Sequence, residues 1–188
     1  MSADPAVLAF LQQRNSAPRL TTPAPNEQEF DQMLRCALRS PDHAWLRPWR
    51  FISFRGERRE VFSQLLLASV LRRNPEADQA VRDKALGAAL RAPLVVAVMA
   101  VIETHPKVPA WEQRISAGCA AFSLSLAAEA LGYASVWRTG DYAGDARLLE
   151  DLGCAANEEC VGFLYIGTRD GTPKAIPELS PGDFHRSW

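Results

Sequence analysis

The chain has 188 residues, of which 47% are hydrophobic and 23% charged, a composition typical of a globular protein that buries a sizeable core. Its 21 Lys and Arg against 22 Asp and Glu give a formal net charge of -1, so a nucleic acid is not an expected partner. The longest apolar stretch, Ala92 to Ile102, is well short of the roughly 20 residues that span a bilayer, so no membrane segment is expected.

No shift in composition divides the chain, and we expect one domain over residues 1–188. The N-terminus lacks the basic region, long apolar segment and cleavage signature of a secretory signal. None of the four cysteines has CxxC spacing, and we expect reduced thiols at Cys36, Cys119, Cys154 and Cys160. These features favour a cytoplasmic protein.

The N-terminal part of the chain is predicted to contain two helices separated by an extended segment. Apolar residues at helical spacing predict a short helix over Pro5 to Gln13, and three prolines predict an extended connection over Ser16 to Pro25. Asn26 with Glu29 resembles a capping box and predicts a helix that ends before Pro41. The following segment, Pro41 to Trp49, is a loop rich in polar and aromatic side chains.

The middle of the chain alternates irregularly between strands and helices. Strands are predicted at Phe51–Phe54, Pro93–Ile102, Tyr133–Trp137 and Cys160–Ile166, and helices at Glu57–Arg72, Glu76–Arg91, Trp111–Leu131 and Asp145–Leu152. The strand Pro93–Ile102 is apolar throughout, so it should lie centrally in a sheet with both faces buried. The lack of regular strand–helix–strand alternation favours an α+β fold, and the segment after Gly167 should be an irregular tail.

The long helix predicted at Trp111–Leu131 has two distinct faces. Its bulkier apolar residues share one side, namely Ile115, Cys119, Phe122, Leu126 and Ala130. Its first half is unusually rich in small residues, Ser116–Ala121, which would allow a backbone or a flat ligand to approach closely. Ordinary helix packing is the simpler explanation of the small residues, and we favour it.

The common catalytic motifs are absent from the sequence: GxGxxG after a strand, GxxxxGK[ST], HExxH and GxSxG. A metal hydrolase would require Asp42, His43 and His105 to converge, because none of the histidines has a ligand at metal-site spacing. We therefore predict no metal site and no side chain that acts as catalytic acid, base or nucleophile.

Several arginines lie beside hydroxyl or amide side chains in predicted loops. They are Arg14 with Asn15 and Ser16, Arg39 before the Pro41 loop, and Arg138 with Thr139. A guanidinium with neighbouring donors suits a phosphate or a polyol. The alternative is structural, with Arg14 and Arg39 as cations at helix C-termini and Arg138 as a surface strand residue.

Taken in order, short motifs along the chain resemble those of the nitroreductase family, in its minimal YdjA-type branch. Arg14–Leu20 resembles the opening RRS-type motif, and Pro41–Trp49 resembles the PDHxxxQPW loop. The other matching blocks are Lys107–Pro109, Trp111–Gln113, Ser116–Ala120, Trp137–Gly140 and Gly162–Thr168. The resemblance therefore covers nearly the whole chain from Arg14 to Thr168.

The resemblance implies an α/β sandwich with a central, mainly antiparallel sheet flanked by helices, in a homodimer that exchanges segments and shares two FMN sites. Arg14, Asn15 and Ser16 would hold the phosphate and ribityl chain, while Trp137, Arg138 and Thr139 would contact the flavin from a strand. Arg39 and His43 would reach the same flavin from the other subunit. FMN binding would then depend on dimerisation.

The resemblance also implies an NAD(P) contact at the end of the long helix, at Ala127, Ala128, Glu129, Ala130, Leu131 and Gly132, for which a plain core helix is the favoured alternative. The chain departs from the family pattern at three positions. Asn15 stands where a second arginine is usual, Arg47 replaces the glutamine of QPW, and Pro18 occupies the place of a lysine near the flavin ring. Arg39 or Arg138 could meet the negative charge of reduced flavin instead.

The implied activity is hydride transfer from NAD(P)H through FMN to nitroaromatics, quinones or similar small electron-poor acceptors, in a ping-pong cycle. Two alternatives remain open from the sequence. One is a flavin-dependent dehydrogenase or ene-reductase of a specific metabolite, and the other is a non-catalytic flavin-binding or storage protein.

Overall fold

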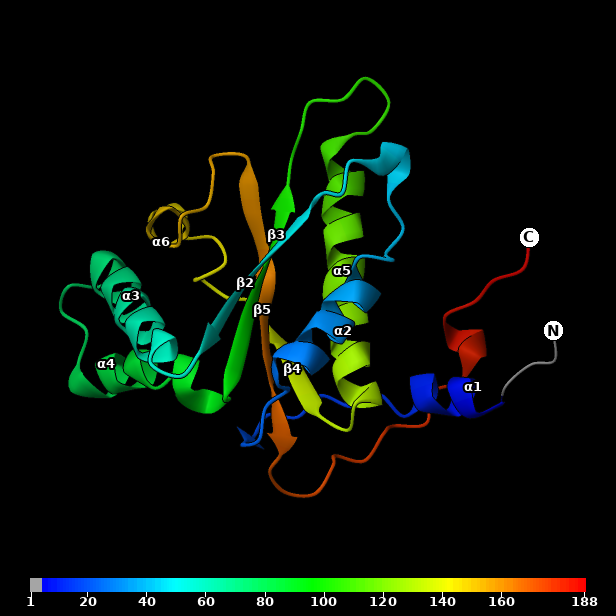
Figure 1. The fold of residues 1–188 in the computed structure, drawn as a ribbon, viewed down its shortest axis with the longest axis horizontal. Coiled ribbons are helices and arrows are strands. Elements are labelled where there is room, and N and C mark those ends of the chain that lie inside the picture. The colour runs from blue at the N-terminus through cyan, green and yellow to red at the C-terminus, as the bar shows by residue number, and fades with distance from the viewer. Residues whose placement is uncertain (1–4) are drawn as a thin grey trace.

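The computed structural model describes residues 5–188 and has the α+β architecture that the sequence predicts (Figure 1). The α-helices are α1 Pro5–Gln12, α2 Glu27–Ala37, α3 Arg58–Arg73, α4 Gln79–Leu86, α5 Ala110–Ala130 and α6 Ala146–Asp151. The strands are β1 Leu20–Thr21, β2 Trp49–Arg55, β3 Leu94–Val101, β4 Ala134–Arg138 and β5 Glu158–Arg169. Short 3-10 turns occupy His43–Trp45, Ala89–Arg91 and Pro181–Asp183.

The strands form a five-stranded sheet in which every pair is antiparallel. Its order is β1-β5-β3-β2, and β4 also pairs with β5. Every residue of β3 is buried, which confirms the prediction of a central strand covered on both faces. Alternate side chains of β3 enter different cores: Val96 and Val98 pack on one face, and Val95 and Ala97 on the other.

Helices cover both faces of the sheet, so the structure has three layers (Figure 1). One core lies between the sheet and the pair α2 and α5, where Phe30 and Met33 pack against the small residues of α5. The other core lies under α3, the Ala89–Arg91 turn and α6, with Phe62, Leu66 and Leu148 at its centre. The sheet therefore separates the two helical layers completely.

The beginning of α2 shows how local sequence determines local structure. The Asn26 side chain accepts a hydrogen bond from the Glu29 backbone N–H at 2.9 Å, and the Glu29 carboxylate accepts one from the Asn26 N–H at 2.8 Å. The predicted capping box is therefore present. Glu29 also accepts a hydrogen bond from the Tyr133 hydroxyl at 2.8 Å, which ties α2 to the end of α5.

The prediction of one helix over Glu76–Arg91 is wrong. Asp78 caps α4 by accepting from the Val81 backbone N–H at 2.8 Å, so the helix starts later, and it ends at Leu86. The chain turns at Gly87 and continues as a separate 3-10 turn, Ala89–Arg91. The turn places buried alanines in the core under α3, which a straight continuation of α4 would not do.

Two strands, β2 and β5, are longer than predicted. β5 runs from Glu158 to Arg169, beyond the expected Cys160–Ile166, because its C-terminal end pairs with β1. The short strand β1 was expected only as an extended connection.

The small residues of α5 face the sheet, with Ala117, Ala120 and Ala121 fully buried, in agreement with ordinary helix packing. All four cysteines are free thiols.

Several segments leave large apolar side chains on the surface. No residue of α1 is buried, and the tail exposes Ile176, Leu179, Phe184 and Trp188. Both α1 and the tail extend to the side of the molecule that carries α5 (Figure 1). Among residues 5–188, none of the helices combines the length and apolar character needed to cross a membrane.

Candidate functional site

The segment Arg14–Ser16, which follows α1, is anchored to strands and to the tail. The Arg169 guanidinium donates to the Asn15 carbonyl at 3.0 Å, and the Asn15 side chain donates to the Lys174 carbonyl. The next residue, Ala17, is fully buried and its N–H donates to the Ser135 carbonyl of β4 at 2.9 Å. The segment is therefore held at a fixed position beside β4.

A cavity of about 590 Å³ lies between this segment, β4 and the tail. It brings together five of the eight residues predicted to contact FMN: Arg14, Asn15, Ser16, Trp137 and Arg138. Within it, the Arg14 guanidinium lies 3.4 Å from the Ser16 hydroxyl oxygen, so both can point at one oxyanion. Lys174 also lines the cavity and adds a third cation beside Arg14 and Arg138. Sequence reasoning missed Lys174 because it lies in the irregular tail, 160 residues from Arg14.

The Trp137 indole forms an exposed aromatic wall of this cavity, and a glycine in β5 makes room for it. A Cβ atom at Gly162 would lie 2.2 Å from Trp137 Nε1 and 2.8 Å from Cδ1, so the ring lies directly on the glycine backbone. Trp137 Nε1 donates to the Val161 carbonyl at 3.3 Å, and the side chain remains 38% exposed. Such a flat, partly exposed surface fits an aromatic ligand of the isoalloxazine type.

Arg138 and Thr139 differ in their position relative to this cavity. Arg138 lines it, and the Arg138 guanidinium also stacks on the Tyr165 ring at 5.6 Å. Its Nε atom is buried and has no hydrogen-bond partner within residues 5–188. Thr139 lies one residue beyond the end of β4 and lines a neighbouring cavity on the α3 and α4 side, which Arg138 also borders.

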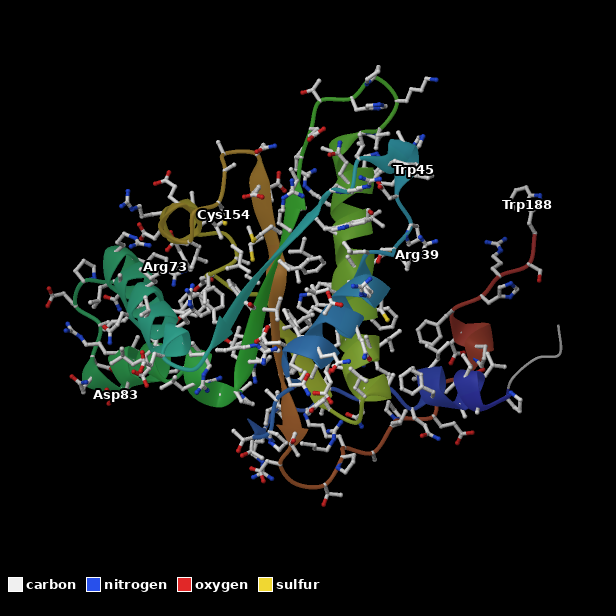
Figure 2. All side chains as sticks on the ribbon, viewed as in Figure 1. Arg39, Trp45, Arg73, Asp83, Cys154 and Trp188 are labelled. Carbon is white, nitrogen blue, oxygen red and sulfur yellow. The ribbon has the colours of Figure 1, made fainter. Side chains whose placement is uncertain are left out.

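The two remaining predicted flavin residues, Arg39 and His43, lie outside this cavity. Arg39 precedes Ser40, whose hydroxyl oxygen is 3.4 Å from that of Ser123 in the second half of α5. Arg39 follows α2 and borders a surface hollow beside the exposed Trp45 (Figure 2). His43 Nδ1 is 2.8 Å from a carboxylate oxygen of Glu112 in the first turn of α5. The Ser116 hydroxyl donates to the Pro41 carbonyl at 2.6 Å, so α5 holds the start of this loop in place.

The loop backbone is strained. Ala44, Trp45 and Arg47 have positive φ angles of 59, 58 and 52°, which is unusual for residues other than glycine. The Asp42 carboxylate accepts a hydrogen bond from the Arg47 N–H at 2.8 Å and closes the loop. Strain of this kind is often found at functional sites.

The His43 loop and the Asn15 segment therefore contact opposite ends of α5 in one protomer. Glu112 contacts the His43 loop, and Glu129, seventeen residues further along the helix, contacts the Asn15 backbone. At a rise of about 1.5 Å per residue, these contacts are roughly 25 Å apart. One protomer alone does not surround a single ligand with both segments.

The segment predicted to contact NAD(P) forms the end of α5 and the turn after it. Ala127 and Ala128 are buried in the core, while Ala130 and Gly132 are exposed and Leu131 is half-buried. Burial raises the pKa of Glu129, and the charges of Arg14 and Arg169 and the hydrogen bond from the Asn15 backbone offset only part of this effect. One Glu129 oxygen is buried without a partner in the described chain. The NAD(P) contact itself stays a prediction.

The residues of the alternative metal site have separate partners. Asp42 bonds to the Arg47 backbone, His43 to Glu112, and His105 Nδ1 accepts from the backbone N–H groups of residues 107 and 108. Within residues 5–188, no three side chains of the metal-binding types form a cluster.

Residues 11–168 match the sequence model of the nitroreductase family. The chain is 40% identical over 177 residues to YdjA of Escherichia coli strain K12, by its name a proposed NAD(P)H nitroreductase, and this match covers 93% of the chain and 96% of YdjA.

Solved structures of similar proteins have the same fold. A nitroreductase-like family protein from Bacillus cereus superimposes with a TM-score of 0.83 at 19% identity, covering 100% of this chain and 98% of that one. A protein from Desulfovibrio desulfuricans, described as a nitroreductase in complex with FMN, gives a TM-score of 0.75 at 20% identity and covers 100% and 99% of the two chains.

Proposed function

The chain belongs to the nitroreductase family, and on this premise we propose that it is an FMN-dependent oxidoreductase that transfers hydride from NAD(P)H to small electron-poor acceptors. The observation that carries this proposal is the cavity in which Arg14, Ser16 and Lys174 surround one end and the Trp137 ring forms a wall. Nitroaromatics and quinones are the acceptors that we expect, in a ping-pong cycle. Residues 1–188 would form one FMN-binding domain in the cytoplasm.

The residues around the cavity fit a flavin phosphate and ring. Arg14, Ser16 and Lys174 would donate to the phosphate, and Asn15 would keep the segment against the tail. The ring would lie against Trp137, with Arg138 and Thr139 at the end of β4 beside it. When bound, FMN supplies the two-electron chemistry, while the protein binds and orients the reactants. This explains why the standard catalytic motifs are absent.

A homodimer would bring the two groups of flavin residues together. If α5 helices pack antiparallel about a two-fold axis, the partner's Arg39 and His43 loop reaches the Arg14 end of the first protomer. The outer face of α5 supports this arrangement, because Trp111, Ile115 and Phe122 are 58%, 57% and 45% exposed. The apolar side chains of α1 and the tail could be buried in the same way by exchange of segments.

The first experiment is an anaerobic absorbance spectrum of FMN-loaded protein before and after NADH or NADPH is added. We expect the oxidised flavin bands to bleach with one of the donors and to return when a nitroaromatic is added. Flavin that binds without bleaching would support a storage protein, and protein that binds no flavin would contradict the proposal. Bleaching reversed only by one metabolite, such as an unsaturated carbonyl compound, would favour the specific dehydrogenase or ene-reductase.

A pair of variants tests whether Arg14 binds the FMN phosphate. Arg14→Ala should weaken FMN binding by about tenfold or more, because a hydrogen-bonded charge contributes roughly 1.5–3 kcal/mol. Arg147→Ala is the matched control, since Arg147 lies on α6 and, among residues 5–188, pairs with Glu150 and Asp151 only. Equal FMN affinity of the two variants would show that Arg14 does not bind the phosphate.

Dimer dependence is tested on the outer face of α5. Ile115→Glu should produce monomers by size-exclusion chromatography and should also lose FMN, because the partner's contacts are lost. Val61→Glu is the control, since Val61 is 63% exposed on α3 at the opposite face of the sheet. Monomeric Ile115→Glu that binds FMN normally would show that the site is complete in one protomer.

A further inference from the structure

A second cavity, of about 510 Å³, lies on the sheet face covered by α3 and α4. Its apolar lining includes Ala85, a buried residue of α4, and Ala88 and Phe163, which belong to the core under these helices. Its rim is the loop that follows β4, from Thr139 to Tyr142. The volume lies within the range of about 300–1,000 Å³ typical of small-molecule sites.

The cavity is strongly cationic although the chain as a whole is nearly neutral. Four basic side chains line it, Arg73, Lys84, Arg91 and Arg138, against the single carboxylate of Asp141. Asp141 is already paired with Arg73 at 3.6 Å. Lys84 and Arg91 have no hydrogen-bond or ion-pair partner in the described part of the chain, which leaves two free cations at the mouth of the cavity.

Two tyrosines add neutral donors and aromatic surface. Burial raises the pKa of both Tyr142 and Tyr165, and the nearby charge of Arg91 offsets part of the effect at each. The two phenols therefore stay protonated and lie near Arg91. The Arg73 guanidinium stacks on Tyr142 at 5.5 Å, as Arg138 does on Tyr165. The polar groups of the cavity are thus nearly all donors, and the rest is flat and apolar.

We propose that this cavity is a binding site for a small organic anion, a carboxylate or phosphate monoester carried on a flat ring, separate from the flavin site. The anion would be held by Lys84 and Arg91, with Arg138 behind them, and the ring would lie over the alanine and phenylalanine lining. Arg138 lines both this cavity and the proposed flavin cavity, so occupancy should alter the flavin spectrum. The proposal does not depend on the reductase activity.

The test is isothermal titration of FMN-loaded protein with four probes: 5′-AMP, benzoate, inorganic phosphate and neutral adenosine. We expect 5′-AMP or benzoate to bind more tightly than the other two probes, and whichever binds tighter identifies phosphate or carboxylate as the anionic group. Arg91→Ala and Lys84→Ala should each weaken binding by about tenfold, since each removes one charged donor. Arg147→Ala should leave binding unchanged.

Thermal melting of each variant shows whether the fold is intact, and we expect it to be, because Lys84 and Arg91 are exposed and unpaired. Binding that needs flavin-free protein and is displaced by FMN would overturn the proposal, because the cavity would then belong to the flavin site. Equal binding of adenosine would rule out an anion site, and equal binding of phosphate would rule out the ring. No binding of either organic anion would also refute it.

Discussion

Replacing Gly162 by alanine tests whether the Trp137 wall depends on contact between the ring and the β5 backbone. Gly162 has a φ of +150°, and the added Cβ would lie 2.2 Å from Trp137 Nε1 and 2.9 Å from the Arg138 carbonyl oxygen. Backbone strain costs about 1–3 kcal/mol, and overpacking costs about 1–3 kcal/mol. Because Trp137 is at the surface and can swing outwards, we expect a total loss near the lower end, about 2–4 kcal/mol.

The assay is urea unfolding of flavin-free protein at fixed concentration, followed by circular dichroism. Gly144→Ala is the matched control, because its Cβ would meet only the Asp141 carbonyl at 4.0 Å and its φ is not positive. We expect this variant to keep or slightly raise the free energy of unfolding. In a Trp137→Ala background the ring clash disappears, so the cost of Gly162→Ala should fall by about 1–2 kcal/mol. Gly162→Ala that unfolds at the parent's urea midpoint would refute the reasoning.

Three further predictions concern titratable groups. Burial opposes ionisation of Asp145, but hydrogen bonds from Ser69, the Leu148 N–H and Arg72 outweigh this effect and hold the pKa of Asp145 below 3.8. Asp145→Ala should therefore lower the free energy of unfolding by about 2–3 kcal/mol at neutral pH. That stability is complete above the unfolded pKa near 3.8 and is lost as the pH falls through the lower folded pKa, so the two unfolding curves should converge in acid; a constant gap would contradict this. Burial raises the pKa of Glu129 in the folded protein above its value in the unfolded chain. The ionised carboxylate therefore lowers the free energy of unfolding as the pH rises through the unfolded-state and then the folded-state pKa. Glu129→Gln should melt at a higher temperature than the parent at neutral pH and at the same temperature in acid. Burial raises the pKa of Cys160 to about 12, so a thiol reagent should label exposed Cys36 in the native protein and Cys160 only after unfolding, as mass spectrometry of labelled peptides can check.

The position of Glu129 has a consequence for the phosphate site. Its carboxylate lies beneath the segment that carries Arg14, and the positive charge of Arg14 is already one of its compensating neighbours. A phosphate bound at Arg14 would compete for that charge. We therefore expect Glu129→Gln to bind FMN at least as tightly as the parent at neutral pH, which a flavin fluorescence titration can measure.

Patterns within short segments of sequence were enough to predict most of the elements and to single out several residues that line one cavity. The capping box at Asn26, the all-apolar strand β3 and the helical spacing in α5 are local features, and the structure has each of them. Arg14 and Ser16 belong to one short motif, as do Trp137 and Arg138, and the structure brings these four residues to one cavity. Their contact with FMN stays a prediction. The one wrong helix shows the limit of local propensity, because a single glycine can either lie inside a helix at a cost or end it, and only packing of the following alanines in the core decided that Gly87 ends α4.

Only the tertiary structure decided which distant residues meet. Lys174 lines the same cavity as Arg14 because the tail returns to the Asn15 segment, and Gly162 lies under Trp137 because β4 and β5 pair. The sheet also placed the small face of α5 inwards and its large apolar residues outwards, which determines where a second copy can pack. In the same way, Lys84 and Arg91 look like ordinary surface charges in the sequence. Long-range strand pairing and packing bring these groups together, and no local sequence pattern predicts which of them meet.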